Sequence, residues 1–147
     1  WWSFLLDRDP AMRSAEALVT GTLQRVGELP EEDRPDVFLV GESLGALAGQ
    51  AALAEADPEA VCGVLWSGAP GGAVSGHLRE RSLGNPDDPV YRLSAGTALH
   101  RPEGWPGLWL PGLSYGTTVL DLGASLAPEH GHGHRYGVEQ DWTLPTC

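Results

Sequence analysis

The chain has 147 residues, of which 41% are hydrophobic and 20% charged, and its formal net charge is −11. These values predict one globular domain with a core of its own. The acidic balance argues against nucleic acid and anionic membrane surfaces as partners. Because no apolar run approaches the roughly 18 residues of a spanning helix, we expect the chain as given to be soluble.

The chain opens on "WWSFLL" and does not begin with Met, so we expect one domain over residues 1–147 that is a piece of a longer protein. Asp9-Pro10 is typical of a helix start, with an acceptor side chain followed by proline. Apolar residues then recur at helical spacing as far as Val26. A polar, Pro-bounded connection follows over Leu29 to Asp36.

Two short apolar runs predict strands buried on both faces, Val37 to Val40 and Val61 to Trp66. The segment between them, Leu44 to Ala56, is rich in Ala and Leu and predicts a helix. The alternation of helix and strand is typical of an α/β fold with a mostly parallel sheet and helices on both faces. After Trp66 we expect mainly loops, with a short helix over Thr117 to Leu126.

The sequence "VGESLG" holds a G-x-S-x-G motif between the first strand and the helix that follows it. This motif in this context predicts a nucleophile elbow, in which Gly41 and Gly45 leave room for a strained turn at Ser43. The first helical amide, that of Leu44, would then face a developing oxyanion. The alternative is a glycine turn that only lets a strand and a helix lie close together.

The chain resembles an actinobacterial α/β-hydrolase family with an N-terminal membrane region and a C-terminal catalytic domain with a lipase-type G-x-S-x-G. The similar features are W-S-F-L-x-D-R, L-P-x-x-x-R-P, "VGESLG", "GVLWSGAP" and "GHGHRYG". They cover Trp1 to Pro70 and Ala124 to Trp142. The resemblance implies a partial α/β-hydrolase-like three-layer fold and a serine hydrolase. It also implies that full-length members lie at the plasma membrane through a region absent from this chain.

A serine nucleophile needs a base and an acid that orients the base, in the chain order Ser, acid, His in this fold. "HGHGH" supplies three histidines on a Gly-rich segment near the C-terminus. The resemblance favours His134 as the base, with His132 second. Two alternatives stay open, namely solvated histidines and a zinc site formed by His130, His132 and His134.

Three aspartates lie between Ser43 and His134 that could be the acid, Asp87, Asp88 and Asp121, and we favour Asp88. The resemblance would place the acid after a strand in an S-D-P motif, whereas no apolar strand precedes "PDDPV". The second oxyanion donor usually comes from a loop after an upstream strand, and we expect no such strand before Ser43. The chain alone is therefore expected to have little activity.

Trp66, Trp105, Trp109 and Leu110 are candidates for an acyl pocket, although such residues also form cores. Cys62 is expected to be a small core residue, and whether it pairs with Cys147 is left open.

The leading interpretation is a serine hydrolase that acts on small-molecule or lipid esters through an acyl-enzyme on Ser43, without a cofactor or metal. An acyltransferase would use the same residues. A non-catalytic remnant that binds a ligand or partner is the alternative from another class.

Overall fold

The computed structural model of the chain describes residues 9–85, 87–92, 99–101, 108–114, 116–117, 120, 133–137 and 141–147. Its helices and strands, in chain order, are α2 (Asp9–Gly27), β1 (Phe38–Glu42), α3 (Leu44–Ala54), β2 (Gly63–Ser67), β3 (Glu80–Leu83) and α4 (Pro89–Arg92). Three short 3-10 turns join them, η1 (Glu31–Asp33), η2 (Pro58–Ala60) and η3 (Pro70–Gly72).

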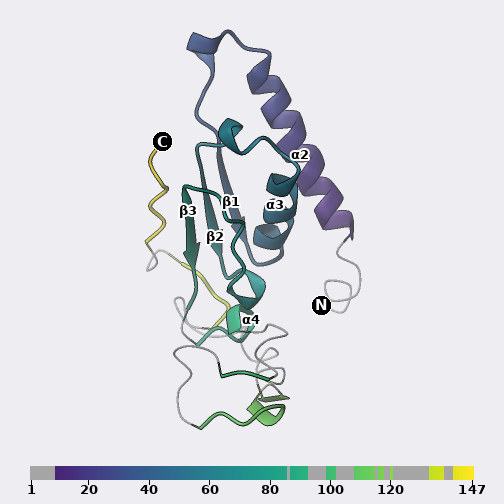
Figure 1. Cartoon of the computed structure of the whole chain (residues 1–147), viewed down its shortest axis with the longest axis vertical. Coiled ribbons are helices and arrows are strands. Elements are labelled where there is room, and N and C mark those ends of the chain that lie inside the picture. The colour runs from purple at the N-terminus through teal and green to yellow at the C-terminus, as the bar shows by residue number, and fades with distance from the viewer. Residues whose placement is uncertain are drawn as a thin grey trace.

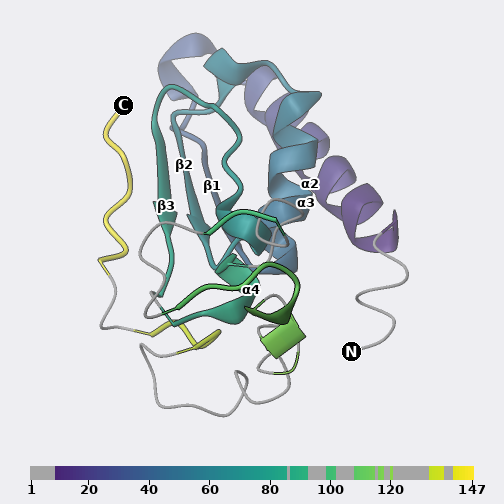
Figure 2. The ribbon, with the colours of Figure 1, turned by 60° about the horizontal axis from the view of Figure 1, so that its bottom comes forward.

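The three strands form one parallel sheet in the order β1-β2-β3, with Phe38 opposite Gly63 and Val64 opposite Glu80. Helices α2 and α3 lie on one side of this sheet (Figures 1 and 2). The expected parallel α/β architecture is thus confirmed. Since all strands run in the same direction, their carboxyl ends meet at one edge, which is the lower edge in Figure 1, near α4.

The core lies between β2 and α3. All five residues of β2, the middle strand of the sheet, are buried. The Trp66 side chain is fully buried beside α3, and a Cβ atom at Gly49 would come within 2.7 Å of its ring. Its indole Nε1 donates a hydrogen bond to Glu80 Oε1 at 2.6 Å. Trp66 is therefore a core residue.

Strand β1 differs from the expectation of a strand buried on both faces. It extends two residues further, through Gly41 and Glu42, and Val40 is 57% exposed. The reason is its position, because among the described strands β1 has a neighbour on one side only. An apolar run at the edge of a sheet looks the same in the sequence as one in its middle.

Strand β3 lies in a region expected to be loop, and it precedes "PDDPV", although it is not the apolar strand that the sequence analysis looked for. Its sequence, Glu-Arg-Ser-Leu, carries almost no apolar signal. Glu80 is accommodated because donors surround its carboxylate. Oε1 accepts from the Trp66 indole and from the Ser75 backbone N–H, and Oε2 accepts from the Gly76 backbone N–H. A partly buried charge satisfied in this way is invisible to hydrophobic patterning.

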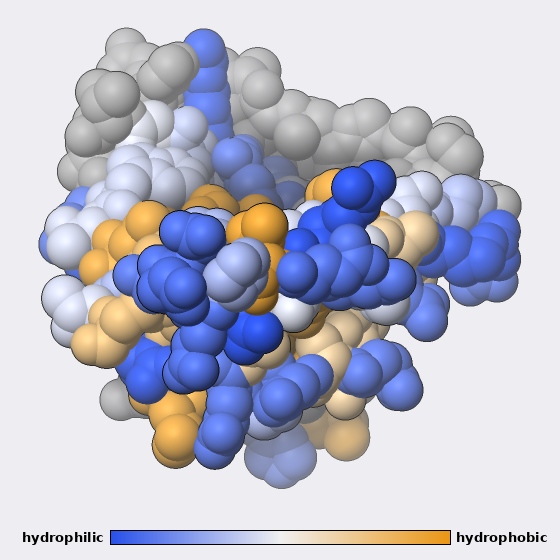
Figure 3. All heavy atoms as spheres, turned by 90° about the horizontal axis from the view of Figure 1, so that it is seen from above, coloured by the Kyte–Doolittle hydropathy of each residue, from blue (hydrophilic) through white to orange (hydrophobic). Residues whose placement is uncertain are grey.

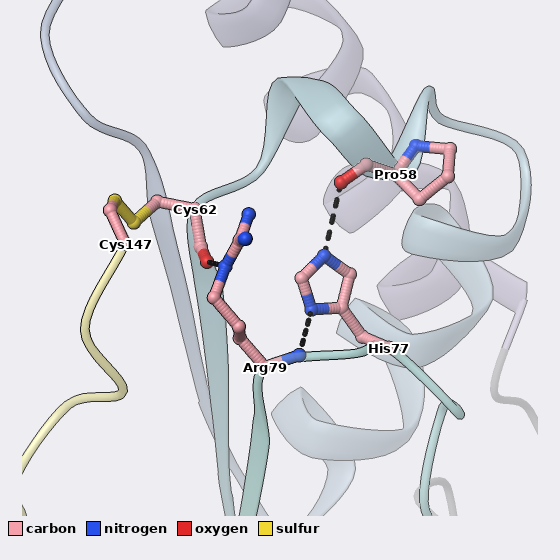
Figure 4. The surroundings of a disulfide bond; sticks show 5 residues. All are labelled: Pro58, Cys62, His77, Arg79 and Cys147. Atoms are coloured by element: carbon pink, nitrogen blue, oxygen red, sulfur yellow. Dashed lines mark hydrogen bonds between the residues drawn. A yellow bond between two sulfur atoms is a disulfide. The ribbon is translucent and has the colours of Figure 1, made fainter.

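The C-terminal segment 141–147 runs beside β3 (Figure 1) and is attached at its end by a disulfide between Cys147 and Cys62 (Figure 4). The pairing left open by the sequence is therefore formed. Arg79 Nε donates to the backbone oxygen of Cys62. Arg81 forms an ion pair with Asp141, with 2.6 Å between Nη2 and Oδ2. The segment is held by covalent and ionic contacts rather than by a strand ladder.

His77 joins the connection before β3 to the turn η2, as Figure 4 shows. The Arg79 backbone N–H donates to His77 Nδ1 at 3.1 Å, so the ring carries its proton on Nε2. Nε2 then donates to the Pro58 carbonyl at 3.0 Å. This histidine is part of the scaffold.

The end of the molecule away from the carboxyl ends of the strands lies at the top of Figure 1. Seen from above in Figure 3, it is mostly hydrophilic with small apolar areas. It includes the exposed acidic residues of η1. None of the helices in the described part of the chain has the length and apolar character needed to cross a membrane.

Candidate active site

Ser43 occupies the turn between β1 and α3 with φ 55° and ψ −116°. It is the one non-glycine residue with positive φ among those described. Such a conformation costs on the order of 1–3 kcal/mol and persists only where its surroundings hold it. Here the Ser43 N–H donates to the Ser67 carbonyl at 2.8 Å, and the Ser43 carbonyl accepts from Ala46 and Leu47 of α3. The turn is thus fastened to both β2 and α3.

The two glycines of the motif contribute differently. A Cβ atom at Gly41 would lie 2.6 Å from the Gly45 carbonyl oxygen and 2.8 Å from the Ala46 backbone nitrogen. At Gly45 a Cβ atom would meet nothing within 4 Å. Both glycines were expected to leave room for the turn, but a side chain would be crowded at Gly41 alone.

His134 lies against the serine, with 2.7 Å between its Nε2 and Ser43 Oγ. Its side chain is 8% exposed. The residues are 91 positions apart in the chain, so the contact is formed by the fold alone. His132, the second choice for this position, and His130 lie outside the described residues.

Asp88 lies on the other side of the imidazole, with 2.8 Å between its Oδ2 and His134 Nδ1. The carboxylate is fully buried, and its Oδ1 accepts the Val90 N–H at 2.8 Å. Asp88 is placed by β3 and α4, since it follows the strand and directly precedes Pro89, the first residue of the helix. Its neighbour Asp87 is exposed, and Asp121 lies outside the described residues.

Two residues that the sequence analysis did not single out complete the surroundings of Asp88. The Tyr136 hydroxyl donates to Asp88 Oδ2 at 2.7 Å, and the Asn85 backbone N–H donates to the Tyr136 oxygen at 3.1 Å. The Asn85 side chain donates to the carbonyls of Gly133 and Arg135, on either side of His134. Burial raises the pKa of Tyr136 well above its usual range, and the hydrogen bond to Asp88 adds to this effect. The only local signal was "HRY", an aromatic residue two positions after the histidine.

Gly68, just after β2, is another residue that the sequence did not single out. Its φ is +56°, and a Cβ atom there would lie 2.6 Å from Tyr136 Cε2 and 2.9 Å from His134 Cε1. Its N–H donates to the Leu83 carbonyl at 2.9 Å. The backbone of Gly68 therefore packs closely against the His134 imidazole and the Tyr136 phenol, with no room for a side chain between them.

Leu44 is the first residue of α3, and the first amides of a helix have no partner within it. They also carry the positive end of the helix dipole, which favours a negative charge nearby. Upstream of β1 the described residues form α2 and η1 without a strand, so the loop expected to carry a second oxyanion donor is not among them.

The zinc alternative has no support from the described part of the site. Both ring nitrogens of His134 already have partners, Ser43 and Asp88. One group of ligand-type atoms occurs among the described residues, namely Asp36 with Cys62 and Cys147. The disulfide uses both of these sulfur atoms, which leaves a single carboxylate.

An apolar cavity of about 400 Å³ lies between α2, β1 and α3. Leu18, Val40, Gly45 and Trp66 are among its lining residues. Of the other residues considered for an acyl pocket, Trp109 is half-buried and Leu110 is 45% exposed, and neither lines this cavity. Trp105 lies outside the described residues.

A protein-family model described as "Alpha/beta-hydrolase family" matches residues 1–95 of the 147. Ser43 and Asp88 lie within the matched range, whereas His134 and Tyr136 lie beyond it. No curated protein and no solved structure matches the chain.

Proposed function

The chain belongs to this alpha/beta-hydrolase family, and on that premise we propose that it is a serine hydrolase that cleaves ester or lipid-like substrates through an acyl-enzyme on Ser43. One observation carries the proposal. Ser43 Oγ, the His134 imidazole and the Asp88 carboxylate form a continuous chain of hydrogen bonds of 2.7 and 2.8 Å. Serine, imidazole and carboxylate in this relation are what activates a hydroxyl as a nucleophile.

In the proposed acylation step, Ser43 Oγ bonds to the carbonyl carbon of the ester as its proton passes to His134 Nε2. The Leu44 N–H donates to the oxyanion that forms on the former carbonyl oxygen. Collapse of this intermediate breaks the bond to the leaving alkoxide, which takes the proton from Nε2. Water then repeats the sequence on the acyl-enzyme, releasing the acid and restoring Ser43.

The assignment of an ester with an apolar acyl group is supported by the cavity between α2 and β1. Its lining includes Gly45, which follows Ser43 by two residues in the chain, together with Leu18 and Val40. An aliphatic chain placed there would cover apolar surface that is otherwise exposed, because Leu18 and Val40 are 71% and 57% exposed.

The test is covalent labelling of the chain by a fluorophosphonate probe, with Ser43→Ala as the control. We expect labelling of the wild-type chain that is absent from the variant, together with slow hydrolysis of p-nitrophenyl esters, because one oxyanion donor is missing from the described residues. A folded chain that neither labels nor hydrolyses these esters would contradict the proposal. It would favour the non-catalytic alternative, a module that binds a ligand or partner.

A further inference from the structure

We propose that Tyr136 is a positioning residue of this site, which fixes where the protons lie along Ser43, His134 and Asp88. The inference rests on the proposed function for its consequence in catalysis. The protonation of the His134 ring is measurable without turnover. Tyr136 is 9% exposed and lies beyond the part of the chain that the family model matches.

The Asn85 backbone N–H sets the direction of the hydrogen bonds around Tyr136. The Asn85 backbone N–H can only donate, so the Tyr136 oxygen accepts at this 3.1 Å contact. The Tyr136 hydroxyl proton therefore points to its other partner, Asp88 Oδ2, at 2.7 Å. Burial raises the pKa of Tyr136, so the phenol remains a donor throughout the neutral pH range.

The orientation of the phenol determines the state of Asp88. Oδ1 receives the Val90 N–H and Oδ2 receives the Tyr136 hydroxyl. A carboxyl group that receives donors at both oxygens is favoured in its ionised form. Asp88 is fully buried, so these donors take the place of the water that would otherwise solvate its charge.

The state of Asp88 in turn determines the tautomer of His134. An ionised carboxylate can only accept, so His134 Nδ1 carries the proton across the 2.8 Å contact. The lone pair of Nε2 is then directed at Ser43 Oγ, 2.7 Å away. This is the form of the ring that can take a proton from the serine.

The Tyr136 ring also packs directly against the His134 ring. The His134 and Tyr136 rings meet edge to face, with centroids 6.0 Å apart and an interplanar angle of 88°. The side chain of Asn85 holds the backbone on either side of His134 through Gly133 and Arg135. The ionisable side chains that raise the pKa of the Tyr136 phenol by their charge are Asp88 and, more weakly, Tyr91.

The experiment follows the ring signals of ¹⁵N-labelled His134 by NMR as a function of pH, in wild type, Tyr136→Phe and the matched control Tyr91→Phe. The loss of the phenol donor leaves the charge of Asp88 less compensated, so the Asp88–His134 pair should take up its proton at higher pH. We expect the midpoint to rise by about half a pH unit or more. Tyr91→Phe should leave it unchanged.

A second substitution protects the test against a misfolded variant. Replacement of tyrosine by 3-fluorotyrosine makes the phenol a stronger donor with little change in shape, so the midpoint should fall instead of rise. An unchanged midpoint in both the folded Tyr136→Phe protein and the fluorinated protein would overturn the inference. Failure of the proposed function has a different signature, because it is the absence of probe labelling while the NMR titration still responds. Where labelling occurs, the acidic limb of the pH–rate profile should move with the midpoint.

Discussion

Gly68 and His134 lie so close together that a Cβ atom on the glycine would be 2.9 Å from Cε1 of the imidazole. The end of the central strand thus contacts the ring with its backbone and leaves no room for a side chain. A side chain at this position would push against the ring whose Nε2 lies 2.7 Å from Ser43 Oγ.

A methyl group at Gly68 should therefore displace the imidazole. We expect Gly68→Ala to slow probe labelling by about 10²-fold, since a shift of about 1 Å is enough to misalign the reacting groups. Gly76→Ala is the matched control, because Gly76 also has a positive φ, +80°, but a Cβ atom there meets nothing within 4 Å. Both variants carry backbone strain, so equal labelling rates for the two would contradict the prediction.

The two glycines of the serine motif should respond in opposite ways to alanine. At Gly41 the new Cβ atom would lie 2.6 Å from a backbone oxygen that cannot easily move, so we expect a loss of about 1–3 kcal/mol in the free energy of unfolding. At Gly45, inside α3 and open to solvent, alanine should stabilise the chain by up to about 1 kcal/mol. Urea denaturation of both variants measures this difference, and equal destabilisation would show that the elbow is not formed as described.

The adjacent aspartates offer a sharp comparison for the acid. Asp88→Asn replaces a carboxylate that accepts at both oxygens by a neutral amide that accepts at one and donates at the other, so the His134 tautomer is no longer fixed, and we expect a loss of about 10³–10⁴-fold in the labelling rate. Asp87→Asn makes the same chemical change one residue away on the exposed surface and should have little effect. A larger loss from the Asp87 variant would contradict the assignment of Asp88 and indicate Asp87 as the acid.

Reduction of the disulfide should affect stability far more than labelling. Cys62 and Cys147 are separated by 85 residues, and a cross-link over a loop of that length removes about 4–5 kcal/mol of chain entropy from the unfolded state as an upper bound. We expect a large drop in the unfolding midpoint with a reductant, while the native reduced chain still reacts through Ser43. An unchanged midpoint would mean that the bond is absent or that it stabilises nothing.

The contact of Asp141 with β3 should give stability a pH dependence in acid. Hydrogen bonds from Thr143, then from Arg81, lower the pKa of Asp141 from 3.8 to about 2. Because the folded-state pKa is the lower one, the stabilisation is present above pH 3.8 and disappears as the pH falls towards about 2. Thermal unfolding of wild type and Asp141→Asn should differ above this window and converge below it. A difference that persists in acid would contradict the assignment.

The sequence was informative where function and pattern coincide locally. The serine turn has its glycines, its strand and its helix within a few residues, so its conformation could be predicted. Strand β3 could not be predicted, because its charged residues are satisfied by partners that only the fold brings near. Glu80 accepts from the Ser75 N–H, and Arg81 forms an ion pair with Asp141. Without that strand, Asp88 had no visible support. The role of Asn85 was hidden for the same reason, since its backbone meets Tyr136 across 51 residues of chain.

The central strand, β2, also sets the distance between the two strands that precede Ser43 and Asp88. The Ser43 N–H bonds to the Ser67 carbonyl on one side of β2, and the Gly68 N–H bonds to the Leu83 carbonyl on the other. Neighbouring strands are about 4.8 Å apart, so the strands that precede the serine and the acid are separated by roughly twice that distance. An imidazole with a hydrogen bond at each end bridges this interval. β2 thus sets the spacing between the strand that precedes Ser43 and the strand that precedes Asp88, although it supplies no side chain to the Ser43–His134–Asp88 hydrogen bonds. An inserted residue near its end should be more damaging to the chemistry than the replacement of any apolar side chain within it.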